Sequence, residues 1–400
     1  MVGDSAWGLS SNISVADMTT YLNQRKAQGF NLIMAEFVTD TYSGISPFNA
    51  QTFDGILAFT GTVTGPFPDL STPNPTYWAR MDQMVAVAAG LGITMLMVPA
   101  DCGNTFGDTY MMQAVRANGH AACVAFGNFL GNRYKGAGNV IWMHGNDYQS
   151  GSDDTYVAGI MQGIQAVWPT SLNTVEYTVA NTDSYSLQAT STWTTAIQFN
   201  QSYPGNNPTS SYQIMQTAYA ASPTMPAYLG EARYEETPTP AVTPFLLRNQ
   251  EYWAMVDGNI GGYVYGNVNI YPFASGWPTH MATTGVTEMG YWASLFRSIN
   301  WWTLVPDTAN TFLTGGFSSG ATLSLGAVAA DGSLGVVYAV STNPVVAMTK
   351  MRGTTTARWY DPTTGTFTSA GSFPNTGSQT FTLPSAHADG NSDYALVLAA

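Results

Sequence analysis

The sequence predicts a (β/α)8 barrel followed by a small C-terminal domain of antiparallel β-strands. About 300 residues alternate short apolar runs with amphipathic helices, and eight such strand–helix units can be counted, as a closed barrel requires. No glycine-rich phosphate-binding sequence follows the first strand, which disfavours the competing fold, an open doubly wound sheet. We therefore expect the barrel over residues 1–311 and a sandwich-like β-domain over residues 312–400.

The expected barrel strands are short apolar runs that end at polar turns. The first should end at Gly3-Asp4, and the others should span residues 31–37, 94–98, 140–143, 174–178, 195–200, 227–229 and 262–265. The helices between and after them should span residues 14–28, 77–89, 121–134, 156–167, 211–220, 243–255 and 287–299. Ser14 can cap the first helix, with Asp17 three residues later, and Gly29 should end it.

The pattern changes after Pro306, where the helical period disappears and short alternating strands begin. Strands are expected over residues 333–340 and 357–360, with a closing strand over residues 394–398. Turns are expected at Asp331-Gly332 and over residues 362–365. This alternation is typical of a compact β-sandwich.

Composition excludes several classes of protein. Only 9% of residues are charged, the net charge is −13 and the sequence pI is about 4.4, so no basic face is available for nucleic acid. No apolar run approaches the ~20 residues that a membrane span needs, so we expect a soluble protein without a membrane partner. The sparsely charged, amide-rich composition predicts a secreted or periplasmic protein. Because no leader precedes the first strand, the leader and some upstream residues are expected to be missing.

The sequence contains two cysteines, Cys102 and Cys123, which could form one disulfide or remain as two buried thiols. The four histidines show no zinc-binding spacing, so no metal and no other cofactor is expected. A serine nucleophile is disfavoured because the chain has no G-x-S-x-G sequence. No obligate protein partner is predicted.

Polar side chains gather where the barrel strands end, which is where (β/α)8 enzymes place their reacting groups. Few charges exist in this chain, yet many of its carboxylates fall at these positions. The residues expected to bind substrate are Asp4, Trp7, Glu36, Asp101, His144, Asn146, Gln201, Tyr203, Arg233, Tyr265, Asn267 and Trp277. Asp4 and Asp101 could instead tie down loops.

Asp147 after the fourth strand and Glu231 after the seventh are the expected catalytic pair. Glycoside hydrolysis needs two carboxyl groups flanking the scissile bond, one of which protonates the leaving oxygen. Asp147 would need a raised pKa to arrive protonated, whereas Arg233 could hold Glu231 ionised. Glu235 and Glu236 are rival carboxylates in the same loop, but they are expected to face solvent.

Several of these motifs resemble the apiosidase-like glycoside hydrolases. They are Gly3-Asp4-Ser5-Ala6-Trp7, Gly29-Phe30-Asn31-Leu32-Ile33, Asn139-Val140-Ile141-Trp142 leading to Gly145-Asn146-Asp147, Gly230-Glu231-Ala232-Arg233-Tyr234-Glu235, and Gly261-Gly262-Tyr263-Val264-Tyr265-Gly266. The tail, with Trp359-Tyr360-Asp361-Pro362 and Gly365, resembles the β-domain of that family, which is labelled collagen-binding.

The resemblance implies a (β/α)8 hydrolase whose characterised activity releases apiose from branched pectin. It implies that Asp147 is the acid/base, that Glu231 is the nucleophile and that the anomeric configuration is retained. The family commonly has Gly-Gly-Asp where this chain has Gly145-Asn146-Asp147, with His144 before it. Another furanoside or a different glycan is therefore also a candidate substrate.

The expected function is a retaining glycoside hydrolase that acts on plant or microbial polysaccharide or oligosaccharide. The alternative is a non-catalytic carbohydrate-binding or adhesion protein on a barrel scaffold, and a lyase is disfavoured by the acidic barrel. The loops over residues 43–75 and 203–212 are expected to decide which sugar and linkage are recognised.

Overall fold

A computed structural model describes residues 1–400 except 40–49, 178–181, 184–189 and 205–209. The chain folds as a (β/α)8 barrel with antiparallel sheets at its C-terminal end, which confirms the expected fold class. It divides into two compact units, Met1–Tyr203 with Gly262–Met281 (unit 1) and Pro204–Gly261 with Ala282–Ala400 (unit 2). The division at residue 311 stays a prediction.

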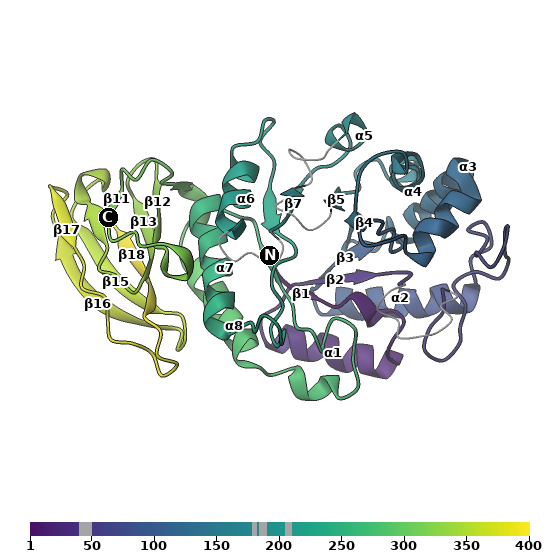
Figure 1. Cartoon of the computed structure of the whole chain (residues 1–400), viewed down its shortest axis with the longest axis horizontal. Helices are drawn as coiled ribbons and strands as arrows, with labels where there is room; N and C mark the ends of the chain where they lie inside the picture. The colour runs from purple at the N-terminus through teal and green to yellow at the C-terminus, as the bar shows by residue number, and fades with distance from the viewer. Residues whose placement is uncertain (40–49, 178–181, 184–189, 205–209) are drawn as a thin grey trace. The chain divides into compact units, whose positions relative to one another are not determined.

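Unit 1 is built from strand–helix repeats. Its strands are β1 (Val2–Ser5), β2 (Leu32–Glu36), β3 (Thr94–Val98), β4 (Val140–Tyr148), β5 (Asn173–Tyr177), β6 (Thr182–Asp183), β7 (Asn200–Tyr203) and β9 (Tyr263–Tyr265). Its helices are α1 (Val15–Ala27), α2 (Pro75–Gly90), α3 (Tyr110–Tyr134), α4 (Asp154–Val167) and α5 (Ser191–Thr194), with the 3-10 helices η1 (Trp7–Leu9) and η2 (Trp277–His280). Figure 1 shows β1 to β4 gathered together with α1 to α4 around them.

The sheet of unit 1 is parallel in the order β5-β4-β3-β2-β1-β9. Asp4 pairs with Ile33, Ile33 with Met95, and Met97 with Trp142 along successive strands. β2 is buried along its whole length, as expected of a barrel strand covered on both faces. Parallel pairing brings the carboxyl ends of these strands to one edge, where the polar residues follow.

Most expected elements of unit 1 are confirmed to within a few residues. β3 coincides with its expected range, and Ser14 caps α1 by accepting a hydrogen bond from the Asp17 backbone N–H. The third helix begins at Tyr110 rather than residue 121, with a break at Gly119, where φ is +77°. The last residue of the expected strand over 174–178 lies outside the described residues, as do residues 43–49 and 205–209 of the two predicted specificity loops.

The expected strand over residues 195–200 is wrong. Thr195 ends the short helix α5, which is anchored by the buried Trp193, and the strand begins only at Asn200. The segment lies beside β5, because the Gln198 N–H donates to the Asn173 carbonyl at 2.9 Å. The alternation of Thr195, Ile197 and Phe199 with polar residues imitates a strand, whereas the true strand is polar and buried.

Unit 2 contains the strand β8 (Ala227–Leu229), which coincides with its expected range, and the helices α6 (Ser210–Tyr219), α7 (Pro244–Gly258) and α8 (Thr284–Arg297). Its antiparallel strands are β10 (Leu304–Pro306), β11 (Leu313–Gly315), β12 (Leu325–Ala329), β13 (Leu334–Val340), β14 (Val345–Ala347), β15 (Thr355–Asp361), β16 (Thr366–Phe373), β17 (Ser378–Thr380) and β18 (Asp393–Ala399). Its 3-10 helices are η3 (Trp301–Thr303), η4 (Gly320–Thr322) and η5 (Met348–Lys350).

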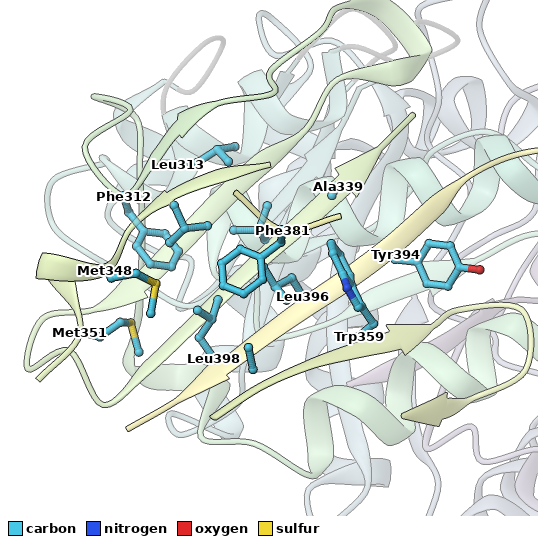
Figure 2. Close-up of a cluster of buried hydrophobic side chains, with 13 residues drawn as sticks. Phe312, Leu313, Ala339, Met348, Met351, Trp359, Phe381, Tyr394, Leu396 and Leu398 are labelled. Carbon is cyan, nitrogen blue, oxygen red and sulfur yellow. The ribbon is translucent and has the colours of Figure 1, made fainter. Parts of the chain in front are cut away.

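The antiparallel strands form a six-stranded sheet, β10-β12-β13-β18-β15-β16, and a three-stranded sheet, β11-β14-β17. Buried residues from both sheets share one hydrophobic core, in which Figure 2 shows Phe312, Trp359 and Phe381. The buried Arg248 of α7 holds this region to the helices of unit 2, because it pairs with Asp393 at 2.7 Å and with Glu288 at 2.9 Å. Within the described residues, no helix is long and apolar enough to cross a membrane.

Candidate active site

The end of β4 has an unusual backbone. Gly145, Asn146 and Asp147 all have positive φ, at 95°, 75° and 48°. The pairing with β5 shifts register between Gly145 and Tyr148, which marks a bulge. A side chain at position 145 would place its Cβ 2.7 Å from the Glu176 carbonyl oxygen, so only glycine fits. Non-glycine residues rarely adopt positive φ, and such strain is concentrated at functional sites.

The Asp147 side chain is partly buried, and its carboxyl group has little compensation for that burial. Its Oδ1 is inaccessible and has no hydrogen-bond partner among the described residues. Burial raises the pKa of the Asp147 carboxyl from 3.8 to about 6. The backbone beneath it is held in place, because Thr105 Oγ1 donates to the Asp147 carbonyl at 2.7 Å. Asp147 is therefore a fixed carboxyl group that can hold a proton near neutral pH.

Asn146 and Glu36 form a buried contact beside Asp147. Asn146 Nδ2 donates to Glu36 Oε1 at 2.6 Å, and neither residue is more than 2% exposed. Glu36 is the last residue of β2, so this contact joins the carboxyl ends of β2 and β4. The short charge-assisted hydrogen bond fixes which way the Asn146 amide faces.

A cavity of about 480 Å³ adjoins Asn146 and Asp147. The rest of its lining comes from the segment after β3 and the start of α3, namely Asp101, Gly103, Asn104, Thr105, Phe106, Gly107, Asp108, Thr109 and Tyr110. Asp101 Oδ1 accepts a hydrogen bond from the Gly103 N–H at 3.2 Å, and Asp101 is 2% exposed. The structure therefore brings the predicted residues Asp101, Asn146 and Asp147 to one cavity.

A second buried polar pair lies at the ends of β5 and β7. Gln201 Nε2 donates to Glu176 Oε1 at 3.2 Å, and both residues are buried. Glu176 was not among the expected site residues. Its position near the carboxyl end of an expected barrel strand, as Glu36 ends β2, was the signal that could have identified it.

Asp4 makes its contacts with the helix that follows its strand. It is fully buried, accepts a hydrogen bond from Tyr21 Oη at 2.5 Å and forms a buried ion pair with Arg25. Arg25 lies 6.0 Å from the centre of the Tyr265 ring, and Trp277 packs against Tyr21 at 6.3 Å. These described contacts hold α1 against β1, and a role for Asp4 in sugar binding stays a prediction.

The other expected binding residues of unit 1 are buried. Trp7 is 1% exposed and Tyr203 8% exposed, and the Asn267 side chain accepts a hydrogen bond from the Asn269 N–H at 2.8 Å. His144 Nε2 lies 3.1 Å from Asn173 Oδ1, and burial lowers the pKa of the His144 imidazole to about 4. His144 is therefore neutral at physiological pH.

In unit 2, Glu231 and Arg233 follow β8 and are partly buried. The side chain of Gln250 on α7 clamps the backbone of Arg233: it accepts from the Arg233 N–H at 3.3 Å and donates to the Arg233 carbonyl at 3.1 Å. Burial lowers the pKa of the Arg233 guanidinium. The loop that carries Glu231 is thus fixed to the helix behind it.

The expectation that Glu235 faces solvent is wrong, whereas Glu236 is exposed. Glu235 is 4% exposed and accepts hydrogen bonds from Thr283 Oγ1 at 2.5 Å and from the Gly285 N–H at 2.9 Å. It therefore satisfies a free N–H at the start of α8, where an anion is favoured by the helix dipole.

Cys102 and Cys123 are free thiols, both buried, so the disulfide is not formed. Burial raises the pKa of the Cys102 thiol well above its usual range and that of Cys123 to about 12, so neither is a reactive thiolate. In the part of the chain that the structure describes, no three His, Cys, Asp or Glu side chains are grouped to hold a metal ion.

The chain matches two family models and is similar in structure to solved glycoside hydrolases. Residues 1–303 match the family model described as "Apiosidase-like, catalytic domain", and residues 325–399 match the "Putative collagen-binding domain of a collagenase". A solved structure described as a glycoside hydrolase is 21% identical with a TM-score of 0.83, over 99% of this chain and 92% of that one. A family 5 glycoside hydrolase from Bacteroides vulgatus is 20% identical with a TM-score of 0.83, over 99% of this chain and 88% of the other. No curated protein matches the chain in sequence.

Proposed function

The chain belongs to the apiosidase-like catalytic-domain family and is a glycoside hydrolase, and from this we propose that it cleaves its substrate with retention of configuration. In this proposal Asp147 is the acid/base and Glu231 the nucleophile. The substrate is a plant or microbial polysaccharide or oligosaccharide, of the apiosidase type or of a related furanosidase or glycanase type.

The observation that carries the proposal is the state of Asp147. A general acid must hold a proton at the working pH and release it in the transition state, which requires a carboxyl pKa well above that of a free aspartate. Burial supplies that shift, to about 6, and the cavity beside Asp147 leaves room for a sugar. Asn146, directed by Glu36, supports the proposal as a hydrogen-bonding group next to the acid.

Glu231 is proposed as the nucleophile from the family resemblance of Gly230-Glu231-Ala232-Arg233. The capping role of Glu235 supports this choice over its neighbour, because a carboxylate that accepts a backbone N–H of α8 is committed to the fold. Retention requires the two reacting carboxyl groups to be about 5–5.5 Å apart, so the proposal predicts that spacing for Asp147 and Glu231.

The test compares Asp147→Asn and Glu231→Gln with the parent enzyme on a panel of plant and microbial polysaccharides. Each variant should lower turnover by about 10²-fold or more while its thermal unfolding midpoint does not fall below that of the parent. Glu235→Gln is the matched control, and it should lower stability rather than turnover per folded molecule. NMR of the first product released should show the anomer of the substrate.

Near-normal turnover of Asp147→Asn or Glu231→Gln would reject the pair, and release of the opposite anomer would reject retention. The alternative function is a non-catalytic carbohydrate-binding or adhesion protein. Binding across the panel without any hydrolysis by the parent protein would favour that alternative.

We further propose that the protein is secreted or periplasmic. The support is compositional, because only 9% of residues are charged and uncharged polar residues supply the remaining polarity. Fractionation of the source cells should find the protein in the medium or the periplasm, and recovery in the cytosol alone would reject this proposal.

A further inference from the structure

We propose that the cavity beside Asp147 binds an uncharged sugar unit adjoining the scissile bond and rejects a uronic acid there. This inference rests on the proposed function, which it deepens by naming the substrate class. Three properties of the cavity favour a neutral sugar: the charges around it, the hydrogen bonds that hold its walls and an exposed ring at its edge.

The ionisable side chains that line the cavity are all acidic. They are Asp101 and Asp108 together with Asp147, which is the proton donor in the proposed function, and none of the described lining residues is a lysine, arginine or histidine. A sugar carboxylate in this space would meet like charges without a cation to bind it, and like-charge juxtaposition is an effective way to exclude a ligand. A neutral sugar would meet only polar groups that accept or donate hydrogen bonds.

Arg116, a cation close to this wall, is already neutralised by two carboxylates. Arg116 on α3 forms an ion pair with Asp108, and its Nε and Nη2 donate to Asp153 at 2.8 and 2.6 Å. Two carboxylates therefore share one guanidinium, and the surroundings of the cavity keep a net negative charge. Arg116 itself does not line the cavity.

Hydrogen bonds to β4 hold the cavity wall in place. The Thr105 hydroxyl donates to the Asp147 carbonyl at 2.7 Å, and Asn104 Oδ1 accepts from the Gln149 N–H at 2.7 Å. At the other end of the segment, Thr109 caps α3 by accepting from the Met112 N–H at 3.1 Å. The space is therefore built from both sides and does not depend on a loose loop.

An exposed aromatic ring completes the wall. Phe106 lines the cavity and is 72% exposed. The neighbouring Tyr110 is fixed, because its hydroxyl donates to the Pro66 carbonyl at 2.7 Å. An apolar ring beside polar groups suits the C–H face of a neutral sugar, since ring contact and hydrogen bonds then act on different faces of the same ligand.

The experiment uses native pectin and glucuronoxylan together with the same polymers after chemical reduction of their carboxyl groups to alcohols. These pairs share linkages and differ in charge. We measure the initial hydrolysis rate of the parent enzyme on each pair. Binding to each pair is measured by affinity electrophoresis of Glu231→Gln, in which the altered residue does not line the cavity. We expect the reduced form to be hydrolysed and bound about tenfold better, with a smaller ratio at high salt.

Two charge variants locate the effect. Asp108→Asn should narrow the preference for the reduced polymer to about threefold, because it removes a carboxylate from the wall and leaves Arg116 with Asp153 alone. Asp82→Asn is the matched control: Asp82 also pairs with an arginine, Arg133, at 2.7 Å, but it does not line the cavity. Asp82→Asn should leave the ratio unchanged, and Phe106→Ala should weaken binding of both forms equally.

The inference would be overturned if the native polymers bind as well as or better than the reduced ones, or if neither form binds. Equal effects of Asp108→Asn and Asp82→Asn on the binding ratio would also overturn it. If Glu231→Gln binds the reduced polymers selectively and the parent enzyme hydrolyses neither form, the proposed function fails while the inference on the cavity stands. If the parent enzyme hydrolyses both forms at equal rates, the inference on the cavity fails while the proposed function stands.

Discussion

Asp4 and Asp147 are both aspartates at the carboxyl end of a barrel strand, yet their surroundings differ, because Asp4 is fully buried and Asp147 is partly buried. Asp4, on β1, accepts a hydrogen bond from Tyr21 and pairs with Arg25. Asp147, on β4, has an inaccessible Oδ1 without a described partner, and its carboxyl pKa is raised to about 6. Burial raises the carboxyl pKa of both aspartates, and at Asp4 the Arg25 guanidinium and the Tyr21 hydroxyl act against that rise. Position at a strand end thus provides an acid, and α1 gives Asp4 a counter-charge that α4 does not give Asp147.

The difference follows from what α1 and α4 present to these strands. Tyr21 and Arg25 are four residues apart on α1, so they share a helix face and both reach Asp4. No arginine or lysine occurs in α4, and the positive-φ turn after His144 carries Asp147 to the cavity instead. We therefore expect substitution of Asp4 to lower the stability of the fold and substitution of Asp147 to lower the rate of hydrolysis.

The largest expected effect on stability is that of Asp4→Ala. It should lower the free energy of unfolding by about 3–5 kcal/mol, because the buried Arg25 guanidinium loses its counter-charge. Urea denaturation measures the change. Asp82→Ala breaks a half-exposed pair with Arg133 and should cost about 1 kcal/mol or less. If the two variants unfold at the same urea concentration, Asp4 does not hold α1 as described.

Glu36→Ala should have the next largest effect, on kcat. Without Glu36 the Asn146 amide loses a charge-assisted hydrogen bond of about 1.5–3 kcal/mol, which corresponds to a roughly tenfold to hundredfold loss of kcat if the amide acts in the transition state. KM should change little. Glu36→Gln keeps an acceptor oxygen and should recover part of the loss. A variant that unfolds more easily but keeps its kcat would show that Glu36 is only structural.

The smallest expected effect is the pH-dependent stability of Asp147→Asn. The carboxyl pKa is higher in the folded state, about 6, than the ordinary 3.8, so the folded parent binds this proton more tightly. The stability of the parent therefore falls as pH rises from about 4 to 6, and the asparagine variant lacks that loss. The rise of the pKa from 3.8 to about 6 corresponds to about 3 kcal/mol, and solvent screening of this partly exposed carboxyl reduces that value. Asp147→Asn should therefore be more stable than the parent by about 2 kcal/mol at pH 7 and equal to it near pH 3. Parallel denaturation curves at both pH values test this, and a less stable variant at pH 7 would contradict it.

Much of the barrel was predictable because apolar runs mark strands that are covered on both faces. β3 and β8 lie where the sequence predicted them, and Ser14 caps α1 as expected. The strand β7 was not predictable in this way, since Asn200-Gln201-Ser202-Tyr203 carries no apolar signal although it is buried. Burial of polar residues inside a barrel depends on partners from other strands, such as Glu176 for Gln201.

The sequence predicted which residues stand at the strand ends of the site, but not which side chains they contact. The sequence placed Asp147 in the catalytic pair and left Asp4 as either a substrate-binding or a loop-fixing residue, and only the structure shows that Tyr21 and Arg25 pack against Asp4. Glu235 illustrates the same limit, because its role depends on the distant residues Thr283 and Gly285. The contact between Glu36 and Asn146 joins residues 110 positions apart, which no local pattern encodes.

The most direct test of the central claim is a carbon-13 NMR titration of the Asp147 side-chain carboxyl, assigned by its absence from the spectrum of Asp147→Asn. We expect this carboxyl to titrate with a midpoint of about 6, because burial without compensation holds its proton. A midpoint at or below that of an ordinary aspartate, about 3.9, would contradict the account, since Asp147 would then reach neutral pH as an anion and could not serve as the proton donor.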